Sequence, residues 1–280
     1  MSTLAPVTPA HPTLRAPGTS ATLRAVIRRG LHDHRRTLLT WGGPLSAMSA
    51  LMAVLWPSIE GSVDTLMESY PAELKEAFNI RALDSVEAYI DAEMLSLVVP
   101  LALAVLAVRA VVRVLSGAEE RGYLDIVLVT PVARRTLAAG AFVVAAIVVA
   151  GVLAVTTAVT WLAATLVGAD PSLVVLARGM ANVWPLALFF AGLAALGCGW
   201  AHTGSPVTAG ALGTLIAMYL FDLLGKLADA AEPLRYVSVF RYYGSAVQDG
   251  IDAFAFAGVT AVAVVLAVAG AIAFERRDVR

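Results

Sequence analysis

Six long runs of apolar residues constrain this chain more than any other feature. Each run approaches or exceeds the ~20 residues that an α-helix needs to cross the hydrocarbon core of a bilayer. The runs lie at 38–56, 94–114, 137–167, 183–201, 207–224 and 254–274. We therefore expect an all-α, polytopic membrane protein with six transmembrane helices. The third run is long enough to require tilting or extension into the aqueous phase.

The composition agrees with this fold class and excludes others. Hydrophobic residues make up 59% of the 280 residues and charged residues only 15%, whereas soluble domains carry roughly 25% charged residues. The net charge of −1 argues against a nucleic-acid partner, because no basic excess exists to neutralise phosphates. With a single cysteine, Cys198, the sequence offers no disulfide framework and no cysteine-based metal site.

The N-terminal segment divides into a tail and a basic amphipathic helix. We expect residues 1–20 to form a disordered cytoplasmic tail, since Pro, Ser and Thr are frequent there. Over 21–37, apolar residues recur on one helical face, and another face carries Arg24, Arg28 and Arg35. This pattern predicts an interfacial helix that lies on the anionic inner leaflet of the membrane.

The distribution of Lys and Arg predicts the orientation of a single six-span domain over 21–280. Fourteen of the 20 lie before the first run, in the last turns of the second run or between it and the third, or after the sixth. Because Lys and Arg are enriched on the cytoplasmic side, we expect both termini in the cytoplasm of a cell-membrane protein. The loop over 57–93 is then external, and Asp84 or Ser85 is expected to cap a short helix within it. The aromatic-rich segment 225–253 is expected to rest in the outer leaflet.

Few polar side chains lie inside the apolar runs, which limits the chemistry available there. Thr156, Thr157 and Thr160 in the third run and Asn182 beside the fourth are candidates to line a substrate pathway. For the threonines, hydrogen bonds to backbone carbonyls or positions between helices are favoured over a lining role. The sequence contains no phosphate-binding loop and no nucleophile or metal-ligand motif. We therefore expect no catalytic, cofactor-binding or metal-binding residue in this chain.

The passage between the second and third runs is the most informative for function. Glu119 and Glu120 precede Gly122, and apolar residues then recur at helical spacing until Pro131. The five arginines in and around this passage favour the cytoplasmic side. A short cytoplasmic helix with one apolar face and a charged beginning is suited to docking a partner.

Residues 117–135 resemble the cytoplasmic loop of type-2 ABC exporter permeases, in which a Glu-Glu-x-Gly-Thr-Leu pattern follows the second span. Tyr123 stands where that family usually has Thr. The resemblance implies that this loop is a coupling helix, which docks into an ATP-hydrolysing partner. The positions that match are Glu119, Glu120, Gly122, Leu124, Asp125, Leu128 and Pro131.

The resemblance also implies a function. Such a permease subunit forms half of a substrate pathway and couples ATP hydrolysis by a separate subunit to alternating access. Its implied partners are two cytoplasmic ABC ATPase subunits holding ATP and Mg²⁺, a second permease subunit (a copy or a paralogue) and membrane lipid. Two other classes stay open, an intramembrane lipid-modifying enzyme and a non-transporting membrane scaffold or immunity protein. The sequence does not predict the substrate.

Overall fold

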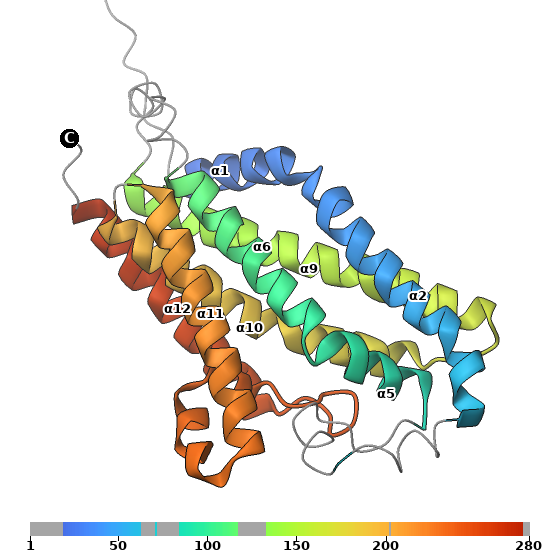
Figure 1. The fold of residues 1–280 in the computed structure, drawn as a ribbon. Coiled ribbons are helices and arrows are strands. Elements are labelled where there is room, and N and C mark those ends of the chain that lie inside the picture. The colour runs from blue at the N-terminus through green and yellow to red at the C-terminus, as the bar shows by residue number, and fades with distance from the viewer. Residues whose placement is uncertain (1–18, 63–70, 72–83, 117–132, 202, 277–280) are drawn as a thin grey trace, which may run out of the picture.

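The computed structural model describes residues 19–62, 71, 84–116, 133–201 and 203–276 (Figure 1). In this part of the chain six helical stretches are long and apolar enough to cross a membrane. They are Leu38–Ser62, which includes α2 (Gly43–Ile59), α6 (Val98–Leu115), α9 (Arg134–Leu166), α10 (Leu173–Trp200), α11 (Gly204–Leu227) and α12 (Ala253–Arg276). The predicted helical fold with six apolar spans is confirmed for these residues.

The fourth span begins earlier than its apolar run indicates. The run predicts a start at 183, whereas α10 begins at Leu173. Ser172 caps the helix, because its Oγ accepts a hydrogen bond from the backbone N of Val175 at 3.4 Å. The carboxylate of Glu87 in turn accepts one from the backbone N of Ser172 at 2.6 Å. Polar contacts from a distant segment thus extend the helix beyond the apolar run.

Helix α10 lies at the centre of the bundle and packs against α12, α6 and α9. Its side chains Met180, Leu186 and Phe190 are fully buried. The backbones of α10 and α12 approach closely because glycine stands at their crossing. A Cβ added at Gly270 would lie 2.5 Å from the carbonyl carbon and oxygen of Ala195. Small residues at a helix crossing permit this kind of packing in a membrane.

Contacts between helix ends define one end of the bundle, which we call the α1 end. Here Oγ of Ser116 lies 3.5 Å from Sγ of Cys198, and Nε of Arg135 donates to the carboxylate of Glu275 at 3.0 Å. These contacts bring together the end of α6, the start of α9 and the ends of α10 and α12. Helix α1 (Thr19–His34) crosses the start of α9 at this end (Figure 1).

The opposite end, which we call the η4 end, carries several short helices (Figure 1). They are α5 (Val86–Ile90), the π-helical turn η3 (Asp91–Leu95), and the 3₁₀ helices η4 (Asp229–Val237) and η5 (Val239–Tyr242). Ser85 caps α5 as predicted, since its Oγ accepts a hydrogen bond from the backbone N of Ala88 at 3.2 Å.

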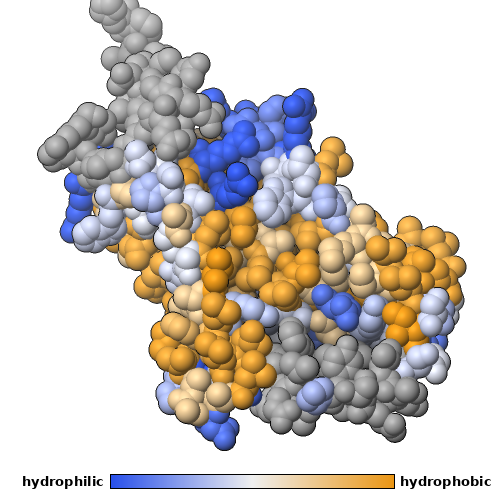
Figure 2. Space-filling view, in the orientation of Figure 1, coloured by the Kyte–Doolittle hydropathy of each residue, from blue (hydrophilic) through white to orange (hydrophobic). Residues whose placement is uncertain are grey.

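The molecular surface carries a broad apolar belt between these two ends. Figure 2 shows hydrophobic residues over α2, α6 and α11, whereas hydrophilic residues gather near α1. Large apolar side chains such as Leu51, Ile216 and Val265 are exposed on α2, α11 and α12. Helices that satisfy their own backbone groups and present apolar side chains outward are the form that lipid surroundings require.

Candidate functional site

The amphipathic helix predicted over 21–37 is observed as α1, and its apolar face packs against α9. Val26 lies against Gly140, where an added Cβ would come within 2.5 Å of Cγ1 of Val26. Val144 of α9 packs on Gly30 of α1 in the same way, with its Cγ2 2.6 Å from an added Cβ. On each helix a valine side chain thus packs against a glycine of the other helix, so the two helices lie close together.

The basic face of α1 points away from this contact. Arg24 and Arg28 lie on the helix, Arg35 follows its last residue, and all three are exposed. A helix with a packed apolar side and an exposed row of cations has the polarity expected at an anionic membrane surface. The three predicted arginines therefore lie together at the α1 end.

The predicted coupling residues fall in 117–132, outside the described residues. They are Glu119, Glu120, Gly122, Leu124, Asp125, Leu128 and Pro131. The residues on either side of the segment are described. Ser116, directly after α6, and Arg135, in the first turn of α9, both make their contacts at the α1 end. The described residues on both sides of the segment therefore lie at the α1 end.

The predicted polar residues of the third span lie buried along α9. Oγ of Ser46 donates to Oγ1 of Thr156 at 3.2 Å, and Oγ1 of Thr160 donates to Oγ of Ser49 at 2.7 Å. Spacings of three on α2 and four on α9 place the two pairs on facing stripes. Thr157 donates to a backbone carbonyl of its own helix at 2.8 Å. Two hydrogen-bonded pairs thus join α2 to α9. Inside a bilayer these hydroxyl groups need partners within the protein, because water does not reach them.

Asn182 belongs to a different polar contact at the η4 end. Its Nδ2 donates to the carbonyl oxygen of Tyr243 at 2.5 Å, and the hydroxyl of Tyr243 donates to a backbone carbonyl of η3 at 3.0 Å. Nη2 of Arg178 donates to the carbonyl oxygen of Val247 at 2.6 Å. The chain over 243–248, which we call the strap, is therefore fastened across α10 and η3.

A buried acid, Asp91, lies beneath the strap. Its carboxylate accepts a hydrogen bond from the hydroxyl of Ser245, whose oxygen accepts one from the backbone N of Gln248 at 3.2 Å. Burial raises the pKa of Asp91 from 3.8 to about 6, while the Ser245 hydrogen bond lowers it and the charge of Asp249 raises it. Burial, together with the charge of Asp91, also raises the pKa of Tyr243 well above its ordinary value.

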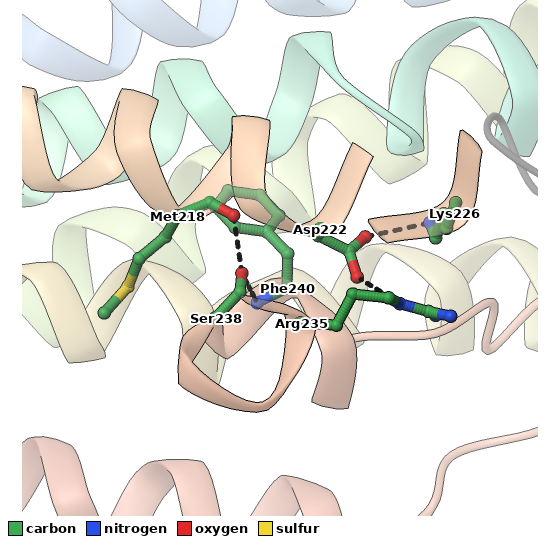
Figure 3. A network of polar contacts seen from close by, with 6 residues as sticks. All are labelled: Met218, Asp222, Lys226, Arg235, Ser238 and Phe240. Carbon is green, nitrogen blue, oxygen red and sulfur yellow. Dashed lines mark hydrogen bonds and ion pairs between the residues drawn. The ribbon is translucent and has the colours of Figure 1, made fainter. Parts of the chain in front are cut away.

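A second buried acid, Asp222, lies near the end of α11 and faces two cations (Figure 3). Nζ of Lys226 is 2.9 Å from Oδ2, and Nε of Arg235 is 3.3 Å from Oδ1. Beside them, the hydroxyl of Ser238 donates to the backbone carbonyl of Met218 at 2.6 Å. These contacts fasten η4 and its following residue to α11.

Sequence reasoning singled out neither of these two acids. Asp222 interrupts the predicted run 207–224, and an ionisable residue inside a span is a signal that it has a partner. Asp91 carries no such signal, because it stands among several other acids in the segment 57–93. Only the folded strap distinguishes it from its neighbours.

These features define a class: a helical membrane protein with six candidate spans, an apolar belt and a basic amphipathic helix at one end. Residues 30–275 match the family described as multidrug efflux system permease Rv1217c, C-terminal domain. Because the match covers most of the chain, the chain belongs to this family and is a permease subunit of an efflux system. The predicted identification as an ABC-type efflux permease is confirmed at this level. None of the curated proteins compared with the chain matches it.

Proposed function

We propose that this chain is the transmembrane subunit of an ATP-driven exporter and that a separate ATPase docks on residues 117–132. One observation carries the proposal beyond the family match. The helix ends that flank this segment lie at the α1 end, together with the exposed Arg24 and Arg28. The α1 end would face the cytoplasm, where both ATP and the ATPase are found.

The packing at the α1 end supplies a route for mechanical coupling. Helix α9 begins directly after the proposed docking segment, and α1 is held on it through Gly140 and Gly30. With 33 residues, α9 is about 50 Å long at 1.5 Å per residue. A displacement of the docking segment would move α1 and α9 together. The Ser46–Thr156 and Ser49–Thr160 pairs would carry this movement to α2.

In this mechanism ATP and Mg²⁺ bind to two ATPase subunits, which close on ATP binding and switch the permease between inward- and outward-open states. This chain supplies the docking surface and half of the pathway. A second permease subunit, a copy or a paralogue, supplies the other half. Lining of the pathway by Thr156, Thr157, Thr160 and Asn182 stays a prediction. A hydrophobic or amphipathic cargo fits the apolar spans, and the name of the family refers to multidrug efflux.

The docking role is tested by reversing charge or polarity in the proposed coupling helix. Glu120→Arg and Leu128→Asp are each expected to lower transport and transport-coupled ATPase activity of the reconstituted complex by about tenfold or more, since each leaves a docked group without its partner. Glu76→Arg, an equal charge reversal in the proposed external loop, is the matched control and should leave both activities unchanged. The purified chain alone sets the background, which we expect to be free of ATPase turnover.

The outcomes separate a docking defect from a folding defect. If Glu120→Arg assembles with the ATPase and transports like the unsubstituted complex, residues 117–132 are not the coupling element. If it fails to copurify with the ATPase while its thermal unfolding temperature is unchanged, the docking role is supported directly.

A further inference from the structure

After α11 the chain turns back along the same helix. Leu227 is the last residue of α11, yet the hydroxyl of Ser238 donates to the carbonyl of Met218. From Leu227 back to Met218 is about 13 Å along a helix that rises 1.5 Å per residue. Phe240 then packs edge-on against Tyr219, with ring centroids 5.5 Å apart. The η4 segment is thereby fixed against the last turns of a membrane span.

Arg235 has a defined orientation on α11. Its aliphatic part lies over Gly225, where an added Cβ would be 2.8 Å from Cδ of Arg235. Its Nε faces Asp222 at 3.3 Å, and the outer edge of the guanidinium points away from that carboxylate (Figure 3). Within the part of the chain that the structure describes, its two Nη groups have no acceptor. Arg235 therefore presents a fixed pair of donors outward.

The position of this arginine favours a ligand from the membrane. Helix α11 has 24 residues, about 36 Å in length, which slightly exceeds the ~30 Å hydrocarbon core and brings its last turn to the level of lipid headgroups. Lys226 lies in that last turn, and it contacts Asp222 as Arg235 does. The carboxylate of Asp222 balances only one of these two cations. The remaining positive charge favours an anionic group at headgroup level, such as a lipid phosphate.

The surroundings of Arg235 are apolar. Leu234, Tyr236 and Val237 are exposed on η4 next to it. Figure 2 shows the hydrophobic surface over α11 continuing to its η4 end. A phospholipid offers a phosphate to the cations and acyl chains to this surface, whereas a free phosphate ion offers only the first.

We propose that Arg235, with Lys226 beside it, binds the phosphate group of a membrane phospholipid at the η4 end. The planar guanidinium binds phosphate through two parallel hydrogen bonds, which a lysine does not reproduce. Asp222 holds the guanidinium through Nε and leaves the Nη edge for the ligand. Because the lipid would bridge α11 and η4, it would brace the segment that reverses the chain.

The test measures lipid binding to the full-length protein in detergent by native mass spectrometry. The probes are dioleoyl phosphatidylglycerol, dioleoylglycerol (the same acyl chains without phosphate) and inorganic phosphate. Arg235→Gln is expected to weaken phosphatidylglycerol binding by about tenfold, and Arg235→Lys by less, since charge-assisted hydrogen bonds are lost. Arg276→Gln, an exposed arginine at the α1 end, is the matched control and should bind as the unsubstituted protein does.

Asp222→Asn distinguishes a ligand site from a purely structural ion pair. It removes the negative charge beside the two cations, while the asparagine oxygen can still accept from Nε of Arg235, so phosphatidylglycerol binding should persist or tighten. The proposal would be overturned in favour of a structural pair if Asp222→Asn lost phosphatidylglycerol binding and its unfolding temperature fell as much as that of Arg235→Gln. It would also be overturned if Arg235→Gln bound phosphatidylglycerol as well as the unsubstituted protein does. The same holds if the unsubstituted protein bound dioleoylglycerol as well as phosphatidylglycerol. Displacement of the lipid by an equal concentration of inorganic phosphate would exclude the lipid as the ligand.

Discussion

At the scale of single residues, the two buried acids of the η4 end have opposite surroundings. Asp222 contacts the cations of Lys226 and Arg235. Asp91 contacts a neutral hydroxyl, that of Ser245, and its pKa is raised to about 6 by burial. A carboxylate without a cationic partner loses hydration on folding and gains little in return. Of these two acids, Asp91 is the one whose charge opposes folding at neutral pH.

The sign of this effect predicts the behaviour of Asp91→Asn. Because the folded state binds the proton more tightly than the unfolded state, stability falls as pH rises from 3.8 to about 6, by about 3 kcal/mol in all. Asparagine keeps an oxygen acceptor for Ser245 and carries no charge. We expect Asp91→Asn to stabilise the solubilised protein by about 1–3 kcal/mol at pH 7.5, and by roughly half as much at pH 5. Unfolding curves in detergent at both pH values measure the difference.

Glu93 supplies the control for this prediction, because it lies in the same π-helical turn and is exposed. Glu93→Gln removes the same charge without relieving burial, so its stability should match that of the unsubstituted protein at both pH values. The stabilisation by Asp91→Asn over the unsubstituted protein should be larger at pH 7.5 than at pH 5. Equal stabilisation at the two pH values would contradict the raised pKa of Asp91.

At the scale of secondary-structure elements, the crossing of α10 and α12 depends on the absence of side chains. An added Cβ at Gly270 would lie 2.5 Å from the carbonyl group of Ala195, which is backbone and cannot rotate away. Gly270→Ala is therefore expected to push the helices apart and to lower stability by about 1–3 kcal/mol. Gly258→Ala in the same helix meets nothing within 4 Å and should change stability by less than about 1 kcal/mol. Thermal unfolding of both variants in detergent tests this contrast, and equal stability would show that the crossing tolerates a methyl group.

The elements that sequence predicted are those with a local signal. The amphipathic pattern of α1 and the cap of α5 by Ser85 follow from residues within one or two turns. The first turns of α10 were missed because Glu87 and the strap satisfy polar groups there from far along the chain. The sequence does not predict the packing of η4 back along α11 for the same reason. Asp222 and Arg235 come into contact only after the chain has reversed its direction.

At the scale of the whole molecule, the two ends of the bundle have different chemistry. Exposed arginines of α1 gather at one end, together with the flanks of the proposed docking segment. The other end carries the strap, the buried acids and η4. The proposed function requires the first end in the cytoplasm, and enrichment of Lys and Arg on the cytoplasmic side favours the same orientation. Orientation is thus the property on which the docking proposal depends.

Single cysteines test this orientation in intact cells. Cys198 is buried, and Cys198→Ala gives a cysteine-free background for Arg28→Cys at the α1 end and Asp229→Cys at the η4 end, both exposed positions. A membrane-impermeant maleimide should label Asp229→Cys in intact cells, and Arg28→Cys only after the membrane is opened. Arg276→Cys, at the same end as Arg28, is the internal control and should behave as Arg28→Cys does. Labelling of both α1-end cysteines from outside would place the docking segment beyond the reach of a cytoplasmic ATPase, because its flanks are tied to that same end by Ser116 and Arg135.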